Sequence, residues 1–200
     1  MRRLAVLTFL TVDGVMQAPS SPDEDTSNGF SQGGWARRYW DEVMQQVMRE
    51  AMSEPYDLLL GRRTYDSFAG AFAEADEEAN PVAKKLNDAR KFVVTSDPSS
   101  LSWANSHAIV GDIASEVSRL KTQEGPLLQV HGSCRLIQLL LSHRLIDEFR
   151  LWTFPVLAGA GKRLFENGTT PATLELLKQE SLECGATMSF YRQPQGSTER

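Results

Sequence analysis

The amino-acid sequence predicts an α/β fold: a three-layer structure in which a mostly parallel, mixed sheet is flanked by helices, with an antiparallel hairpin at the C-terminal end. Short apolar and β-branched runs alternate with segments of helical periodicity along most of the chain, which is the pattern of repeated strand-helix-strand units. The last two runs instead alternate in polarity. They are joined by Cys184-Gly185, which is a hairpin signal and indicates an antiparallel edge.

The first part of the chain is expected to begin with a strand at residues 4–12, LAVLTFLTV, which is β-branched and apolar and ends at the turn signal Asp13-Gly14. Residues 17–34 are rich in Pro, Ser, Asp and Gly, the composition of a long mobile loop. Apolar residues then recur at helical spacing over residues 39–53, and YDLLLG at 56–61 is a second strand.

The rest of the chain continues this alternation. A helix is expected to begin at Arg62, and Asn80-Pro81 opens another that reaches Ala89, with proline at its first position. The remaining strands are expected at residues 90–97, 107–112, 126–132, 147–156, 173–183 and 186–194, and the remaining helices at 113–121 and 133–145.

Length and composition limit the possible classes of protein. With 200 residues, 41% of them hydrophobic, the chain can bury one substantial core, so we predict one domain over residues 1–194 and a disordered tail at 195–200. No stretch approaches the roughly 18 to 20 uncharged apolar residues of a membrane span, and the N-terminal apolar run meets an aspartate without a small-residue cleavage site. We therefore expect a cytoplasmic protein without a membrane partner.

Charge and the metal-binding residue types exclude two further classes. The net charge of −5 disfavours a nucleic-acid partner, because the summed field repels a polyanion. Any bound phosphate must therefore be held by a local cluster of cations. The two cysteines, Cys134 and Cys184, are far apart, and the three histidines show no ligand spacing. We expect neither a disulfide framework nor a metal site.

Polar clusters follow several predicted strands, and in such sheets ligands lie beyond the carboxyl ends of the strands. The first cluster is Gly61-Arg62-Arg63-Thr64, where a helix begins. Backbone N–H groups at a helix start attract an anion, and guanidinium groups add charge-assisted hydrogen bonds. The alternative is an exposed turn in which the arginines pair with acidic residues and Thr64 caps the helix. Both interpretations stay open for the motif by itself.

Two more segments could contact phosphate. Gly132-Ser133 is a second glycine turn between a strand and a helix, where backbone can approach a phosphate closely, although an ordinary tight turn has the same sequence. Gly159-Ala160-Gly161-Lys162-Arg163 is similar to a phosphate-binding loop in composition only, since its glycine spacing is wrong and no Ser or Thr follows the lysine. We interpret it as a basic, flexible loop.

Taken in order, four segments resemble the dihydrofolate reductase fold. They are LLLGRRTYDSF, RKFVVTSD, LLQVHGSCRLIQLLL and IDEFRLWTFPVLAGAGKRLF. The resemblance is to the branch that contains the reductase domain of bacterial riboflavin biosynthesis, which is the C-terminal domain of a bifunctional deaminase-reductase, and to its stand-alone members. It extends from about Leu4 to Tyr191 and implies NADPH as the cofactor and a small molecule as the substrate.

The resemblance also implies a set of site residues. The Gly-Arg-x-Thr turn would bind dinucleotide phosphates, the end of the strand at 90–97 would meet the 2′-phosphate side, and the second glycine turn would receive the pyrophosphate. The implied cofactor-binding residues are Gly61, Arg62, Arg63, Thr64, Thr95, Ser96, Gly132, Ser133 and Cys134. Lys162 and Arg163 would lie near the substrate, with residues 17–34 as a lid.

The reaction also needs an acid, because hydride addition to a carbonyl or imine requires a proton. The candidates are Asp13, Asp41 and Glu42. The resemblance favours Asp13 as the catalytic residue and leaves Asp41 as a substrate-binding candidate. Asp13 could equally form an Asp-Gly turn with its own backbone, and Asp41 and Glu42 could complement the helix dipole. The acid of dihydrofolate reductases falls near Gln45 here, which disfavours dihydrofolate.

The expected function is therefore NADPH-dependent reduction of a small heterocyclic or sugar-phosphate carbonyl or imine. Reduction of 5-amino-6-(5-phosphoribosylamino)uracil is the leading specific hypothesis, although the acidic segment SPDEDTSNG at residues 21–29 should disfavour an anionic substrate. The alternatives are an NADPH-binding sensor or scaffold without turnover, and a dihydrofolate reductase. A homodimer is expected, with the aromatic segment EFRLWTFPVL at 148–157 as its exposed face.

Overall fold

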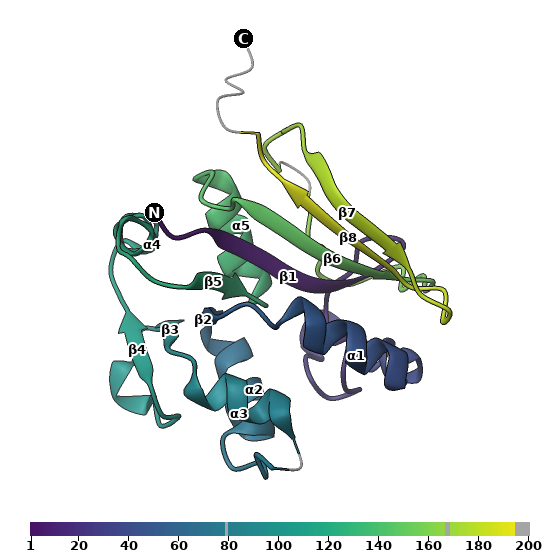
Figure 1. Ribbon diagram of the computed structural model, residues 1–200, viewed down its shortest axis with the longest axis horizontal. Coiled ribbons are helices and arrows are strands. Elements are labelled where there is room, and N and C mark those ends of the chain that lie inside the picture. Colours follow the sequence, from purple (N-terminus) through teal and green to yellow (C-terminus); the bar gives the residue numbers. More distant parts are fainter. Residues whose placement is uncertain (79, 167–168, 195–200) are drawn as a thin grey trace.

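The computed structural model describes residues 1–78, 80–166 and 169–194, and these contribute eight strands to one sheet in the order β4-β3-β2-β5-β1-β6-β8-β7 (Figure 1). The strands are β1 (Leu4–Thr11), β2 (Tyr56–Gly61), β3 (Lys91–Val94), β4 (Ser106–Ile109), β5 (Leu127–Val130), β6 (Glu148–Phe154), β7 (Glu175–Ser181) and β8 (Thr187–Arg192). The helices are α1 (Glu42–Ala51), α2 (Arg62–Phe72), α3 (Pro81–Asp88), α4 (Ile113–Thr122) and α5 (Cys134–Ser142), with short 3-10 turns at η1 (Ser27–Gly29), η2 (Arg37–Tyr39) and η3 (Pro98–Ser100).

The strand directions confirm the predicted fold class. Neighbouring strands from β4 to β6 are parallel, whereas β8 is antiparallel to β6 and β7 is antiparallel to β8. Strand β2 lies between β3 and β5, with Gly61 opposite Val94 and Leu58 opposite Gln129. Because the three strands run in the same direction, the turns that follow them lie at one edge of the sheet.

The sheet is covered on both faces, which explains its continuous apolar runs. In Figure 1 helices α4 and α5 lie on one side of the sheet and α1, α2 and α3 on the other. Leu58 and Leu60 belong to the core cluster on the α1–α3 side and Leu59 to the cluster on the other side, and all three are fully buried. Burial of such a side chain contributes about 1.5–3 kcal/mol, so β2 is fixed from both sides up to the glycine where the site begins.

The predicted helix at residues 39–53 was too long at its N-terminal end. Helix α1 begins at Glu42 because the carboxylate of Asp41 accepts a hydrogen bond from the N–H of Met44, and residues Arg37–Tyr39 form the separate 3-10 turn η2. The strand predicted at 90–97 ends at Val94 for a similar reason, since the Thr95 hydroxyl accepts from the N–H of Asp97 and forms a turn.

The prediction that residues 148–157 form an exposed dimer face was wrong for β6. This strand lies between β1 and β8, and both Trp152 and Phe154 are fully buried. Its aromatic character reflects core packing on a central strand. The exposed strand is β7, in which all seven residues are exposed, including Leu176 and Leu177.

Two other expectations concern the chain as a whole. The disordered tail predicted at 195–200 lies outside the described residues. Among the helices that the structure describes, none is long and apolar enough to cross a membrane.

Candidate functional site

The glycine turns after β2 and β5 bring two helix starts together. The N–H of Gly61 donates to the carbonyl of Gly132 over 3.1 Å. A Cβ at Gly61 would lie 2.3 Å from Oγ of Ser133, and a Cβ at Gly132 would lie 2.6 Å from Oγ1 of Thr64. Both distances are shorter than van der Waals contact. A Cβ at Gly61 would also lie 2.9 Å from the backbone nitrogen of Ser133, so this approach of α2 and α5 requires glycine at Gly61.

Neither of these helix starts carries a side-chain cap from its N-cap residue, within the part of the chain that the structure describes. Gly61 has no side chain to offer, and the hydroxyl of Ser133 makes no capping bond. The first N–H groups of a helix have no partner inside the helix and carry a partial positive charge. Two such starts side by side at the carboxyl edge of the sheet suit a group with several anionic oxygens, such as a pyrophosphate.

The two arginines at the start of α2 extend in different directions. Nε of Arg62 donates to both carboxylate oxygens of Asp66 over 2.8 and 2.9 Å, and its Nη1 donates to the hydroxyl of Ser100 in η3. The side chain of Arg63 is 72% exposed and lies 3.6 Å from the carboxylate of Asp25. Arg62 therefore joins α2 to the segment after β3, and Arg63 faces the loop at residues 17–34.

The turn after β3 is the segment expected at the 2′-phosphate side. Ser96 is exposed and Thr95 is buried. The adjacent Asp97 accepts hydrogen bonds from the hydroxyl and the N–H of Ser99, and the hydroxyl bond is the main reason that the pKa of Asp97 is lowered. An ionised carboxylate beside Thr95 and Ser96 opposes an anion there, whereas Arg62, which contacts Ser100, favours it.

Asp13 fixes the end of β1 to the loop after β6. Its carboxylate accepts from the hydroxyl of Thr11 over 2.5 Å and from the N–H groups of Ala158 and Gly159 over 3.1 and 2.8 Å. These bonds, that of Thr11 first, lower the pKa of Asp13 to about 2 despite the opposing effect of desolvation. Asp13 is therefore ionised at neutral pH. These contacts tie the carboxylate to Thr11 and to a distant loop, and they make the carboxyl a poor proton donor.

The two other candidates on the substrate side, Asp41 and Arg163, make different kinds of contact in the structure. Asp41 is the N-cap of α1, and its carboxylate accepts from the N–H of Met44 over 2.8 Å, so its observed contact is the helix-stabilising one. Arg163 donates to the backbone carbonyls of Asp13 and Gly159, and its Nη2 lies 3.6 Å from the Asp13 carboxylate. The guanidinium of Arg163 therefore contacts the same two segments that Asp13 joins, the end of β1 and the loop after β6.

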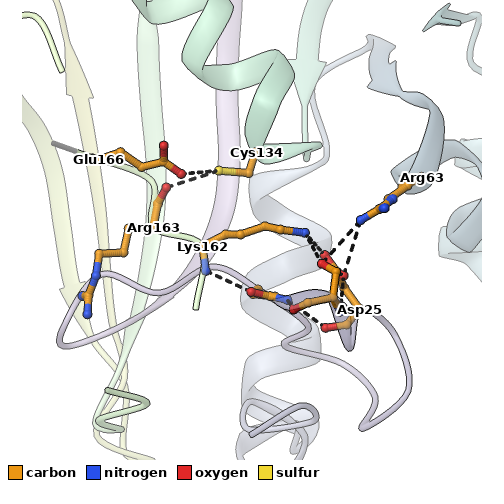
Figure 2. A network of polar contacts seen from close by, with 8 residues as sticks. Asp25, Arg63, Cys134, Lys162, Arg163 and Glu166 are labelled. Carbon is orange, nitrogen blue, oxygen red and sulfur yellow. Dashed lines mark hydrogen bonds and ion pairs between the residues drawn. The ribbon is translucent and has the colours of Figure 1, made fainter. Parts of the chain in front are cut away.

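Lys162 binds the loop at residues 17–34 (Figure 2). Its ammonium forms an ion pair with Asp25 and donates to Oγ of Ser27 over 2.7 Å. Its backbone N–H donates to the side-chain oxygen of Gln17 over 2.9 Å. Burial raises the pKa of Asp25, but the bonds from Lys162 and Ser27 outweigh burial and leave that pKa lowered. The loop is therefore attached to the basic segment by charge.

Cys134 lies at the start of α5, on the other side of this basic segment (Figure 2). Its thiol donates to the carbonyl of Arg163 and to the carboxylate of Glu166, each over 3.4 Å. Burial first, and then Glu166, raise the pKa of the thiol to about 11, so Cys134 is a neutral thiol. A hollow of about 350 Å³ lies beside Arg163 and Glu166 and is also lined by Gly161 and Phe165.

The structure thus brings most of the expected residues to one edge of the sheet. Gly61, Thr64 and the 132–134 turn are in direct contact or adjacent, while Asp41 caps a helix. Three residues of the polar network were not found from the sequence: Gln17, Asp25 and Ser27. Their partner Lys162 lies more than 130 residues away, and no local motif links them. No described residues form a group of three or more His, Cys, Asp or Glu able to hold a metal ion.

Comparisons with known proteins agree with this fold. The chain is 26% identical over 172 residues to the uncharacterized protein YyaP of Bacillus subtilis (strain 168), covering 83% of this chain and 89% of that protein. A crystal structure of a candidate riboflavin biosynthesis protein from Shewanella sp. PV-4 superposes with a TM-score of 0.66 at 18% identity, covering 98% of this chain and all of the other.

A second solved structure is the dihydrofolate reductase of Enterococcus faecalis in complex with NADP(H) and RAB-propyl. It superposes with a TM-score of 0.59 at 12% identity, covering 96% of each chain. At these identities the two structures establish the likeness of fold. The family model of the RibD C-terminal domain matches residues 2–188, nearly the whole sequence, and the chain belongs to the RibD C-terminal domain family.

Proposed function

We propose that this protein is an NADPH-dependent reductase that transfers a hydride to the carbonyl or imine carbon of a small molecule. The observation that carries the proposal is the pair of adjacent helix starts, at Gly61 and Ser133, whose N-cap residues provide no side-chain cap. Family membership and the fold shared with an NADP(H)-bound dihydrofolate reductase support it.

We propose that the cofactor binds at the carboxyl edge of the sheet. The N–H groups at the starts of α2 and α5, including those of Thr64, Ser133 and Cys134, would hold the pyrophosphate, because they are positioned side by side and carry the positive ends of two helix dipoles. Arg62 would contact the 2′-phosphate together with Thr95 and Ser96, and Arg63 would contact a phosphate from the opposite side. When bound, NADPH supplies the hydride.

Asp13 is proposed to act in this reaction through its charge. The carboxylate holds Ala158, Gly159 and Arg163 in place at the end of β1, next to the segment expected to border the nicotinamide. A group with a pKa of about 2 carries almost no proton at neutral pH. Asp13 is therefore proposed as a positioning residue that orients the substrate side of the site, and a proton would come from water or from the substrate.

The substrate is proposed to be a small heterocyclic or sugar-phosphate carbonyl or imine, and 5-amino-6-(5-phosphoribosylamino)uracil is the first compound to test. The experiment is spectrophotometric measurement of NADPH oxidation against a panel that includes this compound, its dephosphorylated form, simple cyclic imines and dihydrofolate. We expect turnover with at least one carbonyl or imine and a lower kcat/KM in Asp13→Asn.

The outcome also separates the alternatives. Tight NADPH binding without turnover of any compound, together with no effect of Asp13→Asn, would favour a sensor or scaffold. Turnover of dihydrofolate alone would support a dihydrofolate reductase. Absence of NADPH binding would remove the proposal itself, since every assigned residue depends on it.

The assembly and location of the protein are further proposals. We propose a cytoplasmic location, which is consistent with membership of a biosynthetic enzyme family. We also propose a homodimer, because the edge strand β7 exposes Leu176 and Leu177, which is the kind of surface that pairs with a second copy. Light scattering during gel filtration measures the mass in solution, and a monomer would contradict this proposal.

A further inference from the structure

Lys162 is a cation in the loop expected on the substrate side of the site, and a carboxylate of the same chain already neutralises it. The ammonium of Lys162 pairs with Asp25 and donates to Ser27 over 2.7 Å. The side chains of Lys162 and Asp25 are each only 24% exposed. Partial removal from water strengthens such a pair relative to a surface pair, so the attachment is stronger than the ordinary contact between exposed side chains.

Arg63 also faces Asp25, but more weakly. Its guanidinium lies 3.6 Å from the Asp25 carboxylate, and its side chain is 72% exposed, so water and salt screen this pair. Asp25 is therefore chiefly the counter-ion of Lys162 (Figure 2).

Backbone contacts hold Asp25 in addition to the bonds that its carboxylate accepts from the N–H and the hydroxyl of Ser27. The side-chain amide of Gln17 donates to the backbone carbonyls of Asp25 and Ser27 over 2.9 and 3.1 Å. The indole N–H of Trp35 in turn donates to the carbonyl of Gln17 over 2.8 Å, and Phe30 is buried. Because backbone contacts present the carboxylate to Lys162, the pair forms with little further loss of conformational entropy.

The same end of the sheet exposes apolar side chains. Val12 follows β1 and is 62% exposed, Leu157 follows β6 and is 76% exposed, and Phe165, which lines the hollow beside Arg163, is 44% exposed. The N–H of Val12 donates to the carbonyl of Val156, so the first two of these side chains belong to adjoining backbone. Exposed apolar side chains and a neutralised lysine at the same end of the sheet suit an apolar, uncharged ligand.

We propose that Asp25 is a specificity-determining residue: its carboxylate takes the place of a substrate phosphate on Lys162, so that the site accepts uncharged carbonyl or imine compounds and rejects phosphorylated ones. This inference rests on the proposed function, in which Asp13 holds Ala158, Gly159 and Arg163 on the substrate side of the site; Lys162 belongs to the same loop. It narrows the proposed substrates to those without a phosphate. A phosphorylated substrate would have to displace a built-in anion and would bring a second negative charge next to it.

The test measures binding of ribose 5-phosphate and of ribose to the protein without cofactor, by calorimetry at fixed ionic strength. We expect the wild type to bind the two sugars equally weakly. Asp25→Asn, which keeps the size of the side chain and the backbone contacts of the loop, should gain a preference for ribose 5-phosphate of about tenfold, the usual effect of one charge-assisted contact. Asp25→Ser is the second variant if the first does not fold.

Two matched controls assign the effect. Asp23→Asn makes the same change of net charge two residues away, at an exposed side chain that forms no ion pair with a described residue, and should bind like the wild type. In the double variant Asp25→Asn/Lys162→Gln the gain should disappear. A tenfold phosphate preference in the wild type, no gain in the Asp25 variants, or a gain that survives removal of Lys162 would each overturn the inference.

Turnover gives an independent measurement. In the NADPH oxidation assay, the ratio of kcat/KM for a dephosphorylated compound to that for its phosphorylated form should fall about tenfold in Asp25→Asn. Because sugar binding is measured without NADPH, a protein that reduces no compound could still show the phosphate gain. Conversely, an active reductase without that gain would lose only this inference.

Discussion

The five helices begin in two different ways. Helices α1, α3 and α4 are each capped by the side chain of the residue before them, since Asp41, Asn80 and Asp112 accept hydrogen bonds from Met44, Ala83 and Ser115. Helices α2 and α5 follow Gly61 and Ser133, which make no side-chain capping bond among the described residues. The two helices of the second group lie next to each other at the edge where the phosphates of NADPH are proposed to bind.

This difference separates helix starts that serve the fold from helix starts suited to a ligand. The missing N-cap bond costs about 1 kcal/mol at Ser133 and about a few tenths of a kcal/mol at Gly61, because glycine is tolerated at the N-cap, and packing must offset this cost. Tyr65 of α2 and Leu136, Ile137 and Leu140 of α5 are buried, so both helices are held by their apolar sides. Two adjacent helix starts without a side-chain capping bond, with packing in compensation, are characteristic of a functional site.

The largest effect is expected from Gly61→Ala. The new Cβ would lie 2.3 Å from Oγ and 2.9 Å from the backbone nitrogen of Ser133, so the two helix starts must move apart. We expect about a 100-fold loss of NADPH affinity by calorimetry, because both sets of N–H groups lose their common geometry. The free energy of unfolding should fall by about 1–3 kcal/mol, as in other overpacked sites.

Gly70→Ala is the matched control for this change. Gly70 lies within α2 and has open space around its Cβ position, so alanine should leave NADPH affinity unchanged and stabilise the protein by about 0.5–1 kcal/mol. Wild-type NADPH affinity in Gly61→Ala would contradict the assignment of this edge to the cofactor.

A smaller effect is expected from the arginines of α2. Arg62→Ala and Arg63→Ala should each weaken NADPH binding about tenfold, the usual worth of a charge-assisted bond. The melting temperature of the protein without cofactor should hardly change, because the contact of Arg62 with Asp66 is an exposed pair worth at most about 1 kcal/mol. A large loss of stability when both arginines are replaced would instead support the interpretation that they pair with acidic residues on the surface.

The same variants separate the roles of the two arginines. The wild type should bind NADPH at least about tenfold more tightly than NADH, and equal affinities by calorimetry would remove the 2′-phosphate assignment. Because Arg62 contacts the segment after β3 and Arg63 faces Asp25, only Arg62→Ala should reduce the preference for NADPH.

A third change contrasts a capped helix start with an uncapped one. Asp41→Ala should lower the melting temperature by about 2–4 °C, the equivalent of about 1 kcal/mol for a chain of this size, and leave NADPH affinity unchanged. Ser133→Ala should do the reverse. Its hydroxyl makes no capping bond, so the melting temperature should be unchanged, and we expect a roughly fivefold loss of NADPH affinity because the hydroxyl is proposed to donate to a phosphate oxygen.

Asp41→Ser tests the remaining role of this residue. Serine also caps helices, so this variant should recover most of the stability lost in Asp41→Ala. A raised KM for substrate in both Asp41 variants, despite that recovery, would show that Asp41 binds substrate as well as capping α1.

The fold was predictable from sequence because its determinants are local. Leu58, Leu59 and Leu60 identify a buried strand by themselves, and Cys184-Gly185 identifies the hairpin. The two glycine turns were predictable for the same reason, since their residue types need no partner to be recognised. The aromatic run in β6 was misassigned to an exposed face because a buried central strand and an apolar surface strand have the same composition.

The electrostatics of the site could not be predicted in this way. Asp25 acquires its role from Lys162 and Gln17, one remote in the sequence and one reached only by folding of the loop. For Asp13 the sequence left proton donation and turn formation equally open, and the difference between them lies in hydrogen bonds from Ala158 and Gly159. Such contacts depend on how distant loops pack and leave no pattern in either segment.

The smallest effect expected is the pH dependence that Asp13 confers, which tests whether this carboxylate belongs with the structural caps or with the site. Its pKa is lowered from 3.8 to about 2 in the folded protein, so between these values the unfolded chain binds more protons. The stability that Asp13 contributes is therefore complete above about pH 4 and is lost as the pH falls toward 2. In denaturant unfolding, the free energies of unfolding of the wild type and of Asp13→Asn should converge as the pH falls through that range. The kcat/KM of Asp13→Asn should be lower than that of the wild type by the same factor at every pH from about 6 to 9, because an ionised carboxylate supplies no titrating proton there. An alkaline limb present in the wild type and absent from Asp13→Asn would make Asp13 the proton donor.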